Sequence, residues 1–348
     1  MSTLDQYIGT LVGCAVGDVL GMPVENWKRE HIKKYVGGIT GIMDVPIPRD
    51  ANGNKLKSDE FGKIGYGITR KMNRGDYTDD TILTLAIAES IAAKKGLDLG
   101  DIAKRQFLEY DKRIMPNGYV MGGFGSTTKK AFENLKKGVS PEESGLPGPG
   151  TGPAMKMAPV GIYMDATERY SRGLYFADKI GRITHTDPRS IAGGLVQAYS
   201  VYRLLQGIER EDFVNEASSL CAGFEDFKTK YPGMVKPDYA LFGGFRWILE
   251  NRDADSEEAF KALGNSGLAF EAHPFAFFMF QKYWNQPLEG LIETINFGGD
   301  CDTTGAIYGA LCGAKYGMIF PDEWVNEIKG VDKLVSAAKG IYDLKQRG

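Results

Sequence analysis

A short stretch late in the chain concentrates oxygen donors. Residues 297–305 read Phe-Gly-Gly-Asp-Cys-Asp-Thr-Thr-Gly, so the carboxylates of Asp300 and Asp302 lie two residues apart, and the hydroxyls of Thr303 and Thr304 follow. Carboxylate and hydroxyl oxygens are the ligands that Mg²⁺, Mn²⁺ and Ca²⁺ prefer. Two carboxylates this close repel each other unless a positive charge lies between them. The stretch therefore indicates a site for a hard divalent cation.

A helix is predicted to begin directly after these acids, because small and apolar residues recur with helical spacing from residue 306 to 314. Asp and Thr often cap the free N–H groups of a helix start, but capping needs only one acid. A calcium-binding EF-hand is excluded, because position 12 counted from Asp300 is Leu311 instead of the bidentate Glu. Three or four donors are too few for a hard cation, so the remaining ligands must come from elsewhere in the chain.

A second acidic cluster precedes another predicted helix. Thr78, Asp79 and Asp80 stand before an apolar run with helical spacing at residues 82–91. As a helix N-cap, this cluster would need only Asp80, and adjacent acids at a helix start are common. Taken together, however, the two oxygen-rich helix starts can complete one another's coordination sphere.

If the two clusters form one site, residues more than two hundred positions apart must meet. A domain boundary between them would separate the two halves of the site. We therefore expect residues 1–348 to form one predominantly helical domain. A loop insertion is predicted at about residues 37–76, where the sequence is rich in glycine, proline and charge and lacks periodicity. Loops of this length in a compact domain are usually functional or mobile, so we expect this one to border the site and to move more than the helices.

Two predicted helices carry a stripe of glycines spaced four residues apart. The stripes are Gly9, Gly13, Gly17 and Gly21 in the helix at residues 7–21, and Gly305, Gly309, Gly313 and Gly317 in the helix after Thr303. Each glycine inside a helix costs about 1 kcal/mol relative to alanine. A groove without side chains admits another helix at close range. We therefore expect both helices in the interior, with at least one stripe against another helix.

Other features allow both a functional and a structural interpretation. The glycine-rich loops at residues 122–126 and 148–153 either present N–H groups to phosphates or form ordinary turns, and neither is a P-loop because no GK[ST] follows. His185 stands before a helix that Asp187 should cap, where a lone histidine more often makes a structural hydrogen bond than does catalysis. Glu25, just past the first helix, is by itself an ordinary surface acid.

Composition excludes several classes of protein. Hydrophobic residues make up 43% of the 348 residues, enough for a large core, and the net charge of −3 offers no basic surface for nucleic acid. The four cysteines form no CxxC pair and indicate the reduced thiols of a cytoplasmic protein. The N-terminal region has no basic segment, and Asp18 interrupts its apolar run, so neither a signal peptide nor a membrane span is predicted.

With these residues in view, the chain resembles the ADP-ribosylglycohydrolase family, which includes dinitrogenase reductase-activating glycohydrolase and the mammalian ADP-ribosyl hydrolases. The resemblance runs from about residue 7 to 317, and the order and wide spacing of four segments make it specific. These are residues 13–25 (Gly-Cys-Ala-Val-Gly-Asp-Val-Leu-Gly-Met-Pro-Val-Glu), 78–81 (Thr-Asp-Asp-Thr), Thr184-His185 with Pro188, and 298–303 (Gly-Gly-Asp-Cys-Asp-Thr). Cys301 and Gly305 replace the Thr and Ala expected there, and residues 37–76 diverge.

The resemblance implies a compact, all-α, single-domain fold of orthogonally packed helices with a two-metal centre that usually holds Mg²⁺ or Mn²⁺. Carried over by position, one cation would bind Thr78, Asp79, Asp80 and Asp302. The other would bind Asp300, Asp302 and Thr303, so that Asp302 bridges the two.

The resemblance also implies a reaction, hydrolysis of the glycosidic bond that links ADP-ribose to a modified side chain or small acceptor. Glu25 and Asp302 would be the catalytic residues, with Glu25 as the acid/base or water-positioning group. The substrate groove would be lined by Gly122, Gly123, Phe124, Gly125, Ser126, Thr151, Gly152, Met155 and His185. The partner would be an ADP-ribosylated protein or a small ADP-ribose conjugate, and neither a membrane nor nucleic acid is expected.

Two other functions are compatible with the same residues. A descendant of the family could keep the fold as a non-catalytic, ADP-ribose-binding or structural protein, which turnover of an ADP-ribosylated peptide would exclude. A two-metal phosphohydrolase would release AMP or phosphate instead of ADP-ribose. The sequence leaves open whether the leaving atom is an arginine nitrogen, a serine oxygen or another acceptor.

Overall fold

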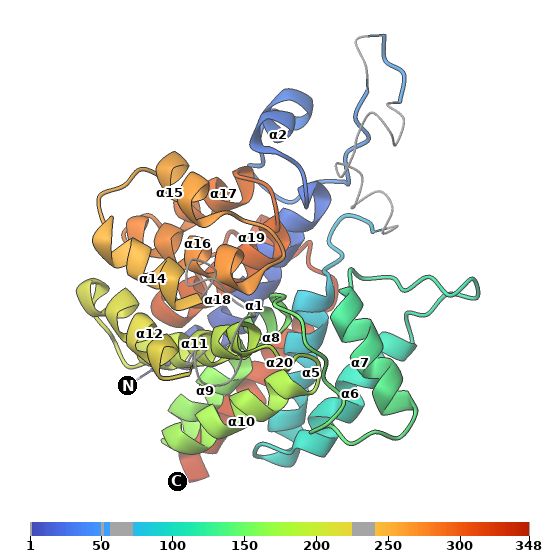
Figure 1. Cartoon of the computed structure of the whole chain (residues 1–348), viewed down its shortest axis with the longest axis vertical. Helices are drawn as coiled ribbons and strands as arrows, with labels where there is room; N and C mark the ends of the chain where they lie inside the picture. Colours follow the sequence, from blue (N-terminus) through green and yellow to red (C-terminus); the bar gives the residue numbers. More distant parts are fainter. Residues whose placement is uncertain (1, 50–51, 56–71, 225–240, 348) are drawn as a thin grey trace.

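Helices and the turns between them make up the computed structural model, which describes residues 2–49, 52–55, 72–224 and 241–347. Within these ranges, β pairing is limited to isolated bridges, such as the one between Leu146 and His185. The predicted all-α fold is confirmed. Figure 1 shows α1 and α18 in the middle of the protein, with α5, α6 and α7 on one side and α12 and α14 to α17 on the other.

The helices follow one another along the whole described chain. The first are α1 (Leu4–Gly21), η1 (Met22–Val24), α2 (Arg29–Val36), α5 (Asp79–Lys94), α6 (Leu99–Asp111) and α7 (Ser126–Lys136). The next are α8 (Gly152–Lys156), α9 (Ala158–Thr167), α10 (Tyr170–Arg182), α11 (Pro188–Leu205) and α12 (Arg210–Phe224). The last are α14 (Leu241–Glu250), α15 (Ser256–Leu263), α16 (Ala269–Lys282), α17 (Pro287–Asn296), α18 (Cys301–Tyr316), α19 (Asp322–Val325), α20 (Val331–Tyr342) and η4 (Asp343–Arg347).

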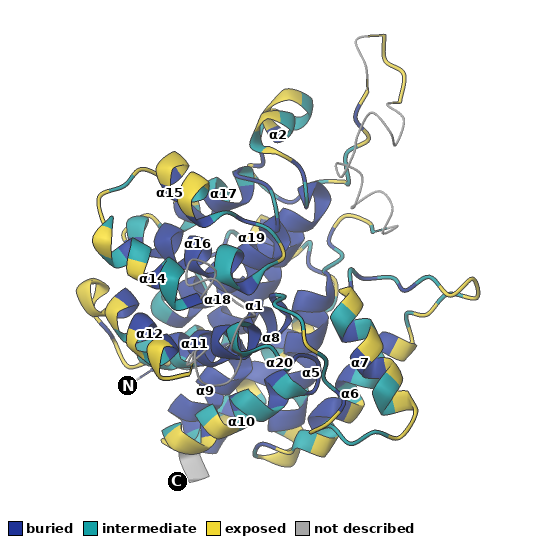
Figure 2. Cartoon of the chain, viewed as in Figure 1, coloured by how far each residue is buried: buried dark blue, intermediate teal, exposed yellow. Residues whose placement is uncertain are grey.

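The helix α1 is buried on all sides. It begins with a capping box in which Thr3 and Gln6 exchange side chain–backbone hydrogen bonds, and from Gly9 onward every residue is buried, as in most of α18 (Figure 2). By length and composition alone, the segment Leu4–Val24 is apolar enough to cross a membrane. Its most apolar window is 94% buried inside the protein, which fits a core helix.

The two glycine stripes face each other across an antiparallel helix pair. A Cβ atom added to Gly13 would lie 2.2 Å from the carbonyl oxygen of Gly309, and one added to Gly17 would lie 1.8 Å from that of Gly305. Real Cβ atoms do not approach other atoms this closely, so α1 and α18 are in direct backbone contact. The prediction that both helices lie in the interior with a stripe against another helix is confirmed.

We expect Gly17→Ala to destabilise the protein strongly. The added methyl group would overlap the carbonyl of Gly305, so two buried helix backbones would have to separate. Overpacking a core typically costs about 1–3 kcal/mol, and more where backbone must move. Urea denaturation should therefore show a loss of about 3 kcal/mol or more in the free energy of unfolding.

The matched control for this variant is Gly223→Ala, in α12, where an added Cβ would meet no described residue within 4 Å. There the higher helix propensity of alanine should leave stability unchanged or raise it by up to about 1 kcal/mol. Equal stability of the two variants would contradict the backbone contact between α1 and α18.

The predicted loop insertion at 37–76 is anchored at both ends. Near its start, Asn296 of α17 accepts from the backbone N–H of Ile39 at 2.7 Å and donates to its carbonyl oxygen at 2.9 Å. Near its end, Arg74 forms an ion pair with Glu327 at 2.9 Å. Residues 50–51 and 56–71 lie outside the described residues, so the predictions that this loop borders the site and is mobile stay predictions.

Candidate active site

The antiparallel pairing of α1 and α18 places the end of one helix beside the start of the other. Glu25 follows η1 directly after α1, and Asp300 and Asp302 stand at the start of α18. Each of the three buried carboxylates has an oxygen within 4.8 Å of an oxygen of the other two. The structure thus brings together acids that are some 275 residues apart in the sequence.

A tight backbone turn fixes the acids of α18. Gly298 and Gly299 adopt φ values of 74° and 69°, the left-handed region that favours glycine. The N–H of Gly299 donates to the carbonyl of Trp27, and the N–H of Asp300 donates to the carbonyl of Asn265, each at 2.9 Å. A Cβ atom on Gly299 would lie 1.9 Å from that same Asn265 oxygen. The turn is therefore in direct backbone contact with the segments that carry Trp27 and Asn265.

The expectation that an acid of this cluster caps α18 is wrong at the N-cap position. Asp300 occupies that position, but its side chain accepts no backbone hydrogen bond from the helix. Its Oδ2 instead lies 3.4 Å from the hydroxyl of Thr151, across the site. Asp302 accepts from the N–H of Thr303 at 3.0 Å with one oxygen. Both carboxylates are therefore held toward the site and not along the helix axis.

The cluster at the start of α5 is arranged differently from the prediction, because Thr78 and not Asp80 caps the helix. The Thr78 hydroxyl accepts weakly from the N–H of Asp80 and donates to Asp80 Oδ2 at 3.0 Å. The N–H of Asp79 donates to the carbonyl of Gly122 at 2.7 Å. Asp80 Oδ1 is buried and has no hydrogen-bond partner within the described residues. A buried carboxylate oxygen without a protein donor can accept from a water molecule or bind a cation.

Asp18 ties α5 to α1, and the sequence analysis did not single it out for this role. Its fully buried carboxylate accepts from the N–H groups of Thr78 and Thr81, at 3.0 and 3.1 Å, and from the Thr81 hydroxyl at 2.6 Å. Burial, and then the charge of Asp302, raise the pKa of Asp18 to about 7. The signal in the sequence was one charged residue in the stretch 11–21, which is otherwise apolar or glycine.

The acids at the end of α1 and at the starts of α5 and α18 form one wall of a cavity of about 330 Å³. That wall consists of Glu25, Asp79, Asp80, Asp300, Asp302 and Thr303. The predicted substrate residues that line the cavity are Gly123, Gly125, Ser126, Thr151, Gly152, Met155 and His185. Lining residues that the sequence analysis did not name as site residues are Thr127, Thr128, Pro149, Gly150, Gly267 and Leu268.

Three of the predicted site residues lie behind the cavity wall. Phe124 is 2% exposed and packs on Tyr110, with ring centroids 5.4 Å apart, because its side chain points away from the cavity that its neighbours line. Gly122 contributes its carbonyl to Asp79 instead of a surface to the cavity. Thr78 is fully buried beneath Asp80, to which its hydroxyl donates.

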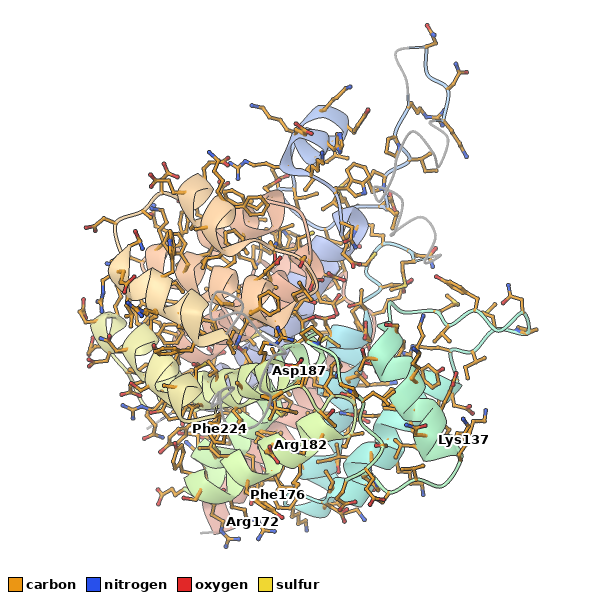
Figure 3. The ribbon with its side chains drawn as sticks, viewed as in Figure 1. Lys137, Arg172, Phe176, Arg182, Asp187 and Phe224 are labelled. Carbon is orange, nitrogen blue, oxygen red and sulfur yellow. The ribbon has the colours of Figure 1, made fainter. Side chains whose placement is uncertain are left out.

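The second glycine-rich loop closes over the ring of His185. A Cβ atom on Gly150 would lie 3.2 Å from His185 Nε2, and one on Gly152 would lie 2.5 Å from Cε1, so only glycine allows the loop to come so near. The turn that carries His185 runs between α10 and α11, and Figure 3 labels its flanking residues Arg182 and Asp187. Burial, and then the nearby Lys156, lower the pKa of His185 to about 3, so its ring is neutral.

Lys156, the last residue of α8, is a fully buried cation that the sequence analysis passed over. Its ammonium group donates to the hydroxyl of Thr184 at 3.0 Å. Burial lowers the pKa of Lys156 to about 7, and the charge of Asp79 opposes that shift. Lysine is almost never fully buried unless it is paired, and here the partner is the Thr184 hydroxyl beside His185.

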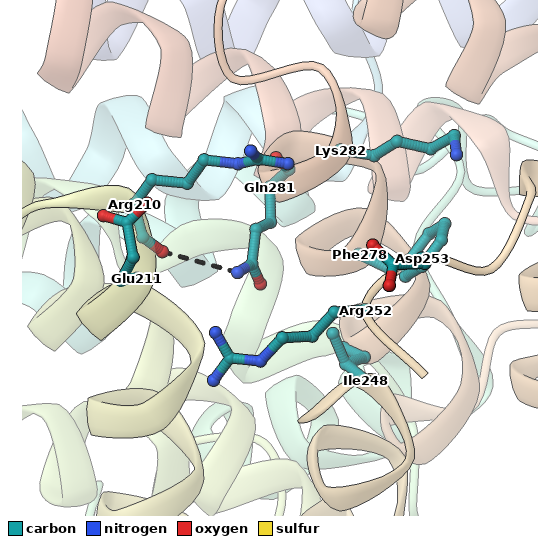
Figure 4. Close-up of a pocket in the computed structure, with 8 residues that line it drawn as sticks. All are labelled: Arg210, Glu211, Ile248, Arg252, Asp253, Phe278, Gln281 and Lys282. Atoms are coloured by element: carbon teal, nitrogen blue, oxygen red, sulfur yellow. Dashed lines mark hydrogen bonds between the residues drawn. The ribbon is translucent and has the colours of Figure 1, made fainter. Parts of the chain in front are cut away.

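A second cavity, of about 170 Å³, lies between α12, α14 and α16 and differs from the first (Figure 4). Its basic groups already have partners: Arg210 donates to the carbonyl of Gln281 at 2.9 Å, and Lys282 to that of Ala254 at 2.9 Å. Arg252 reaches Asn215 at 3.2 Å. No group of metal-ligating side chains lines it within the described residues, so the cavity at Asp300 is the functional candidate.

Comparison with known proteins shows the family of this chain. The model of the ADP-ribosylglycohydrolase family matches residues 1–348. The chain belongs to this family. Its members are hydrolases that act on the glycosidic bond of ADP-ribose and depend on metal.

Relatives within the ADP-ribosylglycohydrolase family are similar over nearly their whole length. The chain is 27% identical to the ADP-ribosylhydrolase ARH3 of Homo sapiens, covering 99% of this chain and 95% of ARH3. It is 26% identical to the ADP-ribosyl-[dinitrogen reductase] glycohydrolase of Rhodospirillum rubrum, covering 94% and 91%. A solved ADP-ribosylglycohydrolase-related protein complex superposes with a TM-score of 0.64 at 23% identity, covering 98% of each chain, which shows the shared fold.

The residues present fit the metal dependence of the ADP-ribosylglycohydrolase family. Carboxylate oxygens converge on one point from Glu25, Asp300 and Asp302, and the buried Oδ1 of Asp80 lacks a donor within the described part of the chain. Burial, and then the charges of Asp302 and Asp18, raise the pKa of Asp80 well above its usual value. This crowding of acids with hard oxygen ligands is the environment that a divalent cation relieves.

Proposed function

We propose that the protein is a binuclear-metal-dependent hydrolase that cleaves the bond between the distal ribose of ADP-ribose and a modified side chain or small acceptor. The observation that supports it most is the meeting of Glu25, Asp300 and Asp302 in one cavity with the start of α5. Glycine-rich loops and His185 line the same cavity and are suited to a ligand with phosphates and hydroxyls. An oxygen-rich wall and a ligand-binding wall then face one substrate.

Two divalent cations, Mg²⁺ or Mn²⁺, are proposed for the oxygen-rich wall. One would be held by Asp79, Asp80 and Asp302 at the cavity, with Thr78 beneath Asp80 as a further oxygen donor. The other would be held by Asp300, Asp302 and Thr303. When bound, such cations lower the pKa of a water molecule, neutralise the acids and orient the ribose hydroxyls.

The protein's own groups are assigned the remaining tasks. Glu25 is proposed to move the proton at its carboxylate, either from the attacking water or to the leaving atom. One of its oxygens, Oε1, already accepts from the side-chain N–H of Asn26 at 2.9 Å, which fixes the orientation of the carboxyl group. Breaking the glycosidic bond leaves oxocarbenium-like positive charge on the sugar ring. His185 and the glycine-rich loops bind the rest of ADP-ribose.

The test is a panel of ADP-ribosylated substrates, on arginine, on serine and on small acceptors, offered with Mg²⁺ or Mn²⁺ and followed by mass spectrometry. Release of free ADP-ribose is expected, and the substrate turned over identifies the leaving atom. Release of AMP or phosphate would instead favour a phosphohydrolase. Binding of ADP-ribose without turnover of any substrate would favour a non-catalytic member of the family.

Cation binding is expected to raise thermal stability. Bound cations remove the repulsion among the buried acids, and a ligand at a hundred times its Kd stabilises a protein by about 2.7 kcal/mol. Differential scanning calorimetry should therefore show a higher Tm with Mg²⁺ or Mn²⁺ and a return to the lower value with EDTA. Asp80→Asn should lose most of this shift, whereas Asp253→Asn, at the second cavity, should retain it. A shift of equal size in both variants would place the cations elsewhere.

A further inference from the structure

We infer that Lys156 and Thr184 are positioning residues that hold neutral His185 in the tautomer with its proton on Nε2, the ring nitrogen next to the cavity. The inference deepens the proposed function, on which the identity of the ligand, ADP-ribose, rests. It concerns two residues behind the cavity wall, neither of which lines the cavity.

The hydroxyl of Thr184 has three neighbours and one hydrogen. Lys156 Nζ lies at 3.0 Å, His185 Nδ1 at 2.9 Å and the carbonyl oxygen of Gly181 at 3.4 Å. Below its pKa of about 7 the Lys156 side chain is charged and can only donate, so at pH 6 it occupies a lone pair of the hydroxyl oxygen. The hydroxyl hydrogen must therefore point to His185 or to Gly181.

The carbonyl of Gly181 is already satisfied. It accepts from the N–H of Thr184 at 3.1 Å and from the N–H of His185 at 3.0 Å, which uses both of its lone pairs. The remaining distance of 3.4 Å from the hydroxyl is also long for an O–H···O hydrogen bond. The Thr184 hydroxyl therefore donates to His185 Nδ1, which must be unprotonated to accept.

A neutral imidazole that accepts at Nδ1 carries its hydrogen on Nε2. Nε2 makes no hydrogen bond to any described residue, and it lies beside Gly150 at the cavity. The two hydrogen bonds, from Lys156 to Thr184 and from Thr184 to His185, thus leave one uncharged N–H donor, at Nε2, facing the cavity. Such a donor suits a phosphate or hydroxyl oxygen of ADP-ribose.

The opposite tautomer is disfavoured by the same contacts. With a hydrogen on Nδ1, the Thr184 oxygen would accept from both Lys156 and His185, and its own hydrogen would be left with the occupied Gly181 carbonyl. Nε2 would then present a lone pair to the cavity, which repels phosphate oxygens. Lys156 also opposes protonation of His185 through its charge, because that charge lowers the pKa of the ring.

Two-bond ¹H–¹⁵N correlation spectra of the full-length protein distinguish the tautomers directly. The chain has three histidines, so His185→Asn assigns the resonances of His185 by difference. We expect wild-type His185 to show a protonated Nε2 and an unprotonated Nδ1. Thr184→Val, which keeps the shape and removes the hydroxyl, should give a mixture of tautomers, and Thr184→Ser should restore the wild-type pattern. Lys156→Met should raise the Nδ1–H fraction as well.

Calorimetric titration with ADP-ribose gives the second measurement. Thr184→Val should weaken binding in proportion to the loss of the Nε2–H form, about twofold for an equal mixture of tautomers and about tenfold if only a tenth keeps that form, while Thr184→Ser keeps wild-type affinity. A protonated Nδ1 in the wild type, or an unchanged spectrum in folded Thr184→Val, would overturn the inference. If wild-type protein does not bind ADP-ribose, the proposed function fails, and the spectra still decide the tautomer.

Discussion

Replacing Asp302 with asparagine is expected to lower turnover by more than 100-fold. Asp302 lies at the start of α18 between the acids of α5 and those near Glu25, and it is the proposed bridge between two cations. Two divalent cations about 3.5–4 Å apart repel each other strongly, and only a charged ligand reduces that repulsion. Asparagine keeps one oxygen, which can still accept from the N–H of Thr303, but it removes the charge.

The loss should exceed the roughly 10–100-fold that follows removal of a group behind a metal ligand. Metal titration by calorimetry should show fewer than two cations bound or a much weaker second one, beside an unchanged circular dichroism spectrum. Asp98→Asn is the matched control, because Asp98 caps α6 by accepting from Asp101 N–H and asparagine can do the same. Wild-type stoichiometry and turnover in Asp302→Asn would remove the case for a bridging ligand.

Glu25→Gln is expected to abolish most turnover while metal and ADP-ribose still bind. General acid–base catalysis contributes roughly 100- to 10,000-fold, and glutamine cannot transfer the proton. The side-chain oxygen of glutamine can still accept from Asn26, so the group should keep its place. The measurement is kcat and KM on the best substrate of the panel, with a separate titration of metal and ADP-ribose.

Glu258→Gln serves as the control for Glu25→Gln. Glu258 completes the capping box of α15, where glutamine works as well as glutamate, so full activity is expected. Because Glu25 lies within ligand distance of Asp300 and Asp302, a loss of bound metal in Glu25→Gln would make it a ligand instead of a proton-transfer group. Full activity of Glu25→Gln would show that Glu25 is an ordinary acid without a catalytic role.

The helices that carry the site could be predicted from the sequence because their signals are local. Apolar periodicity located α1, α5 and α18, and the Asp187–Pro188 pair located the start of α11. The glycine stripes even predicted close helix packing, since a helix that lacks side chains along one face loses stability unless another backbone packs there. The domain boundaries, the metal ligands and the substrate residues remain predictions.

The residues that the sequence analysis missed depend on partners far away in the chain. Asp18 serves the start of α5, Lys156 serves the turn before α11, and Asn265 holds the backbone turn before Asp300. A single polar residue in an apolar helix or in a loop does not reveal which distant donor it meets. Phe124 shows the opposite error, since neighbouring residues of a glycine-rich loop face different sides and only some reach the cavity.

The backbone contact between α1 and α18 also governs the order of assembly during synthesis. The two helices meet only after about 280 further residues have been made beyond α1, which takes roughly 14–56 s at typical translation rates. Throughout this time α1, which is apolar enough to cross a membrane, is exposed without its partner. Contacts so distant along the chain also slow folding. We therefore expect the nascent chain to need chaperones that cover its first helix. A fragment that stops before Gly298 would lack that helix's partner together with Asp300 and Asp302.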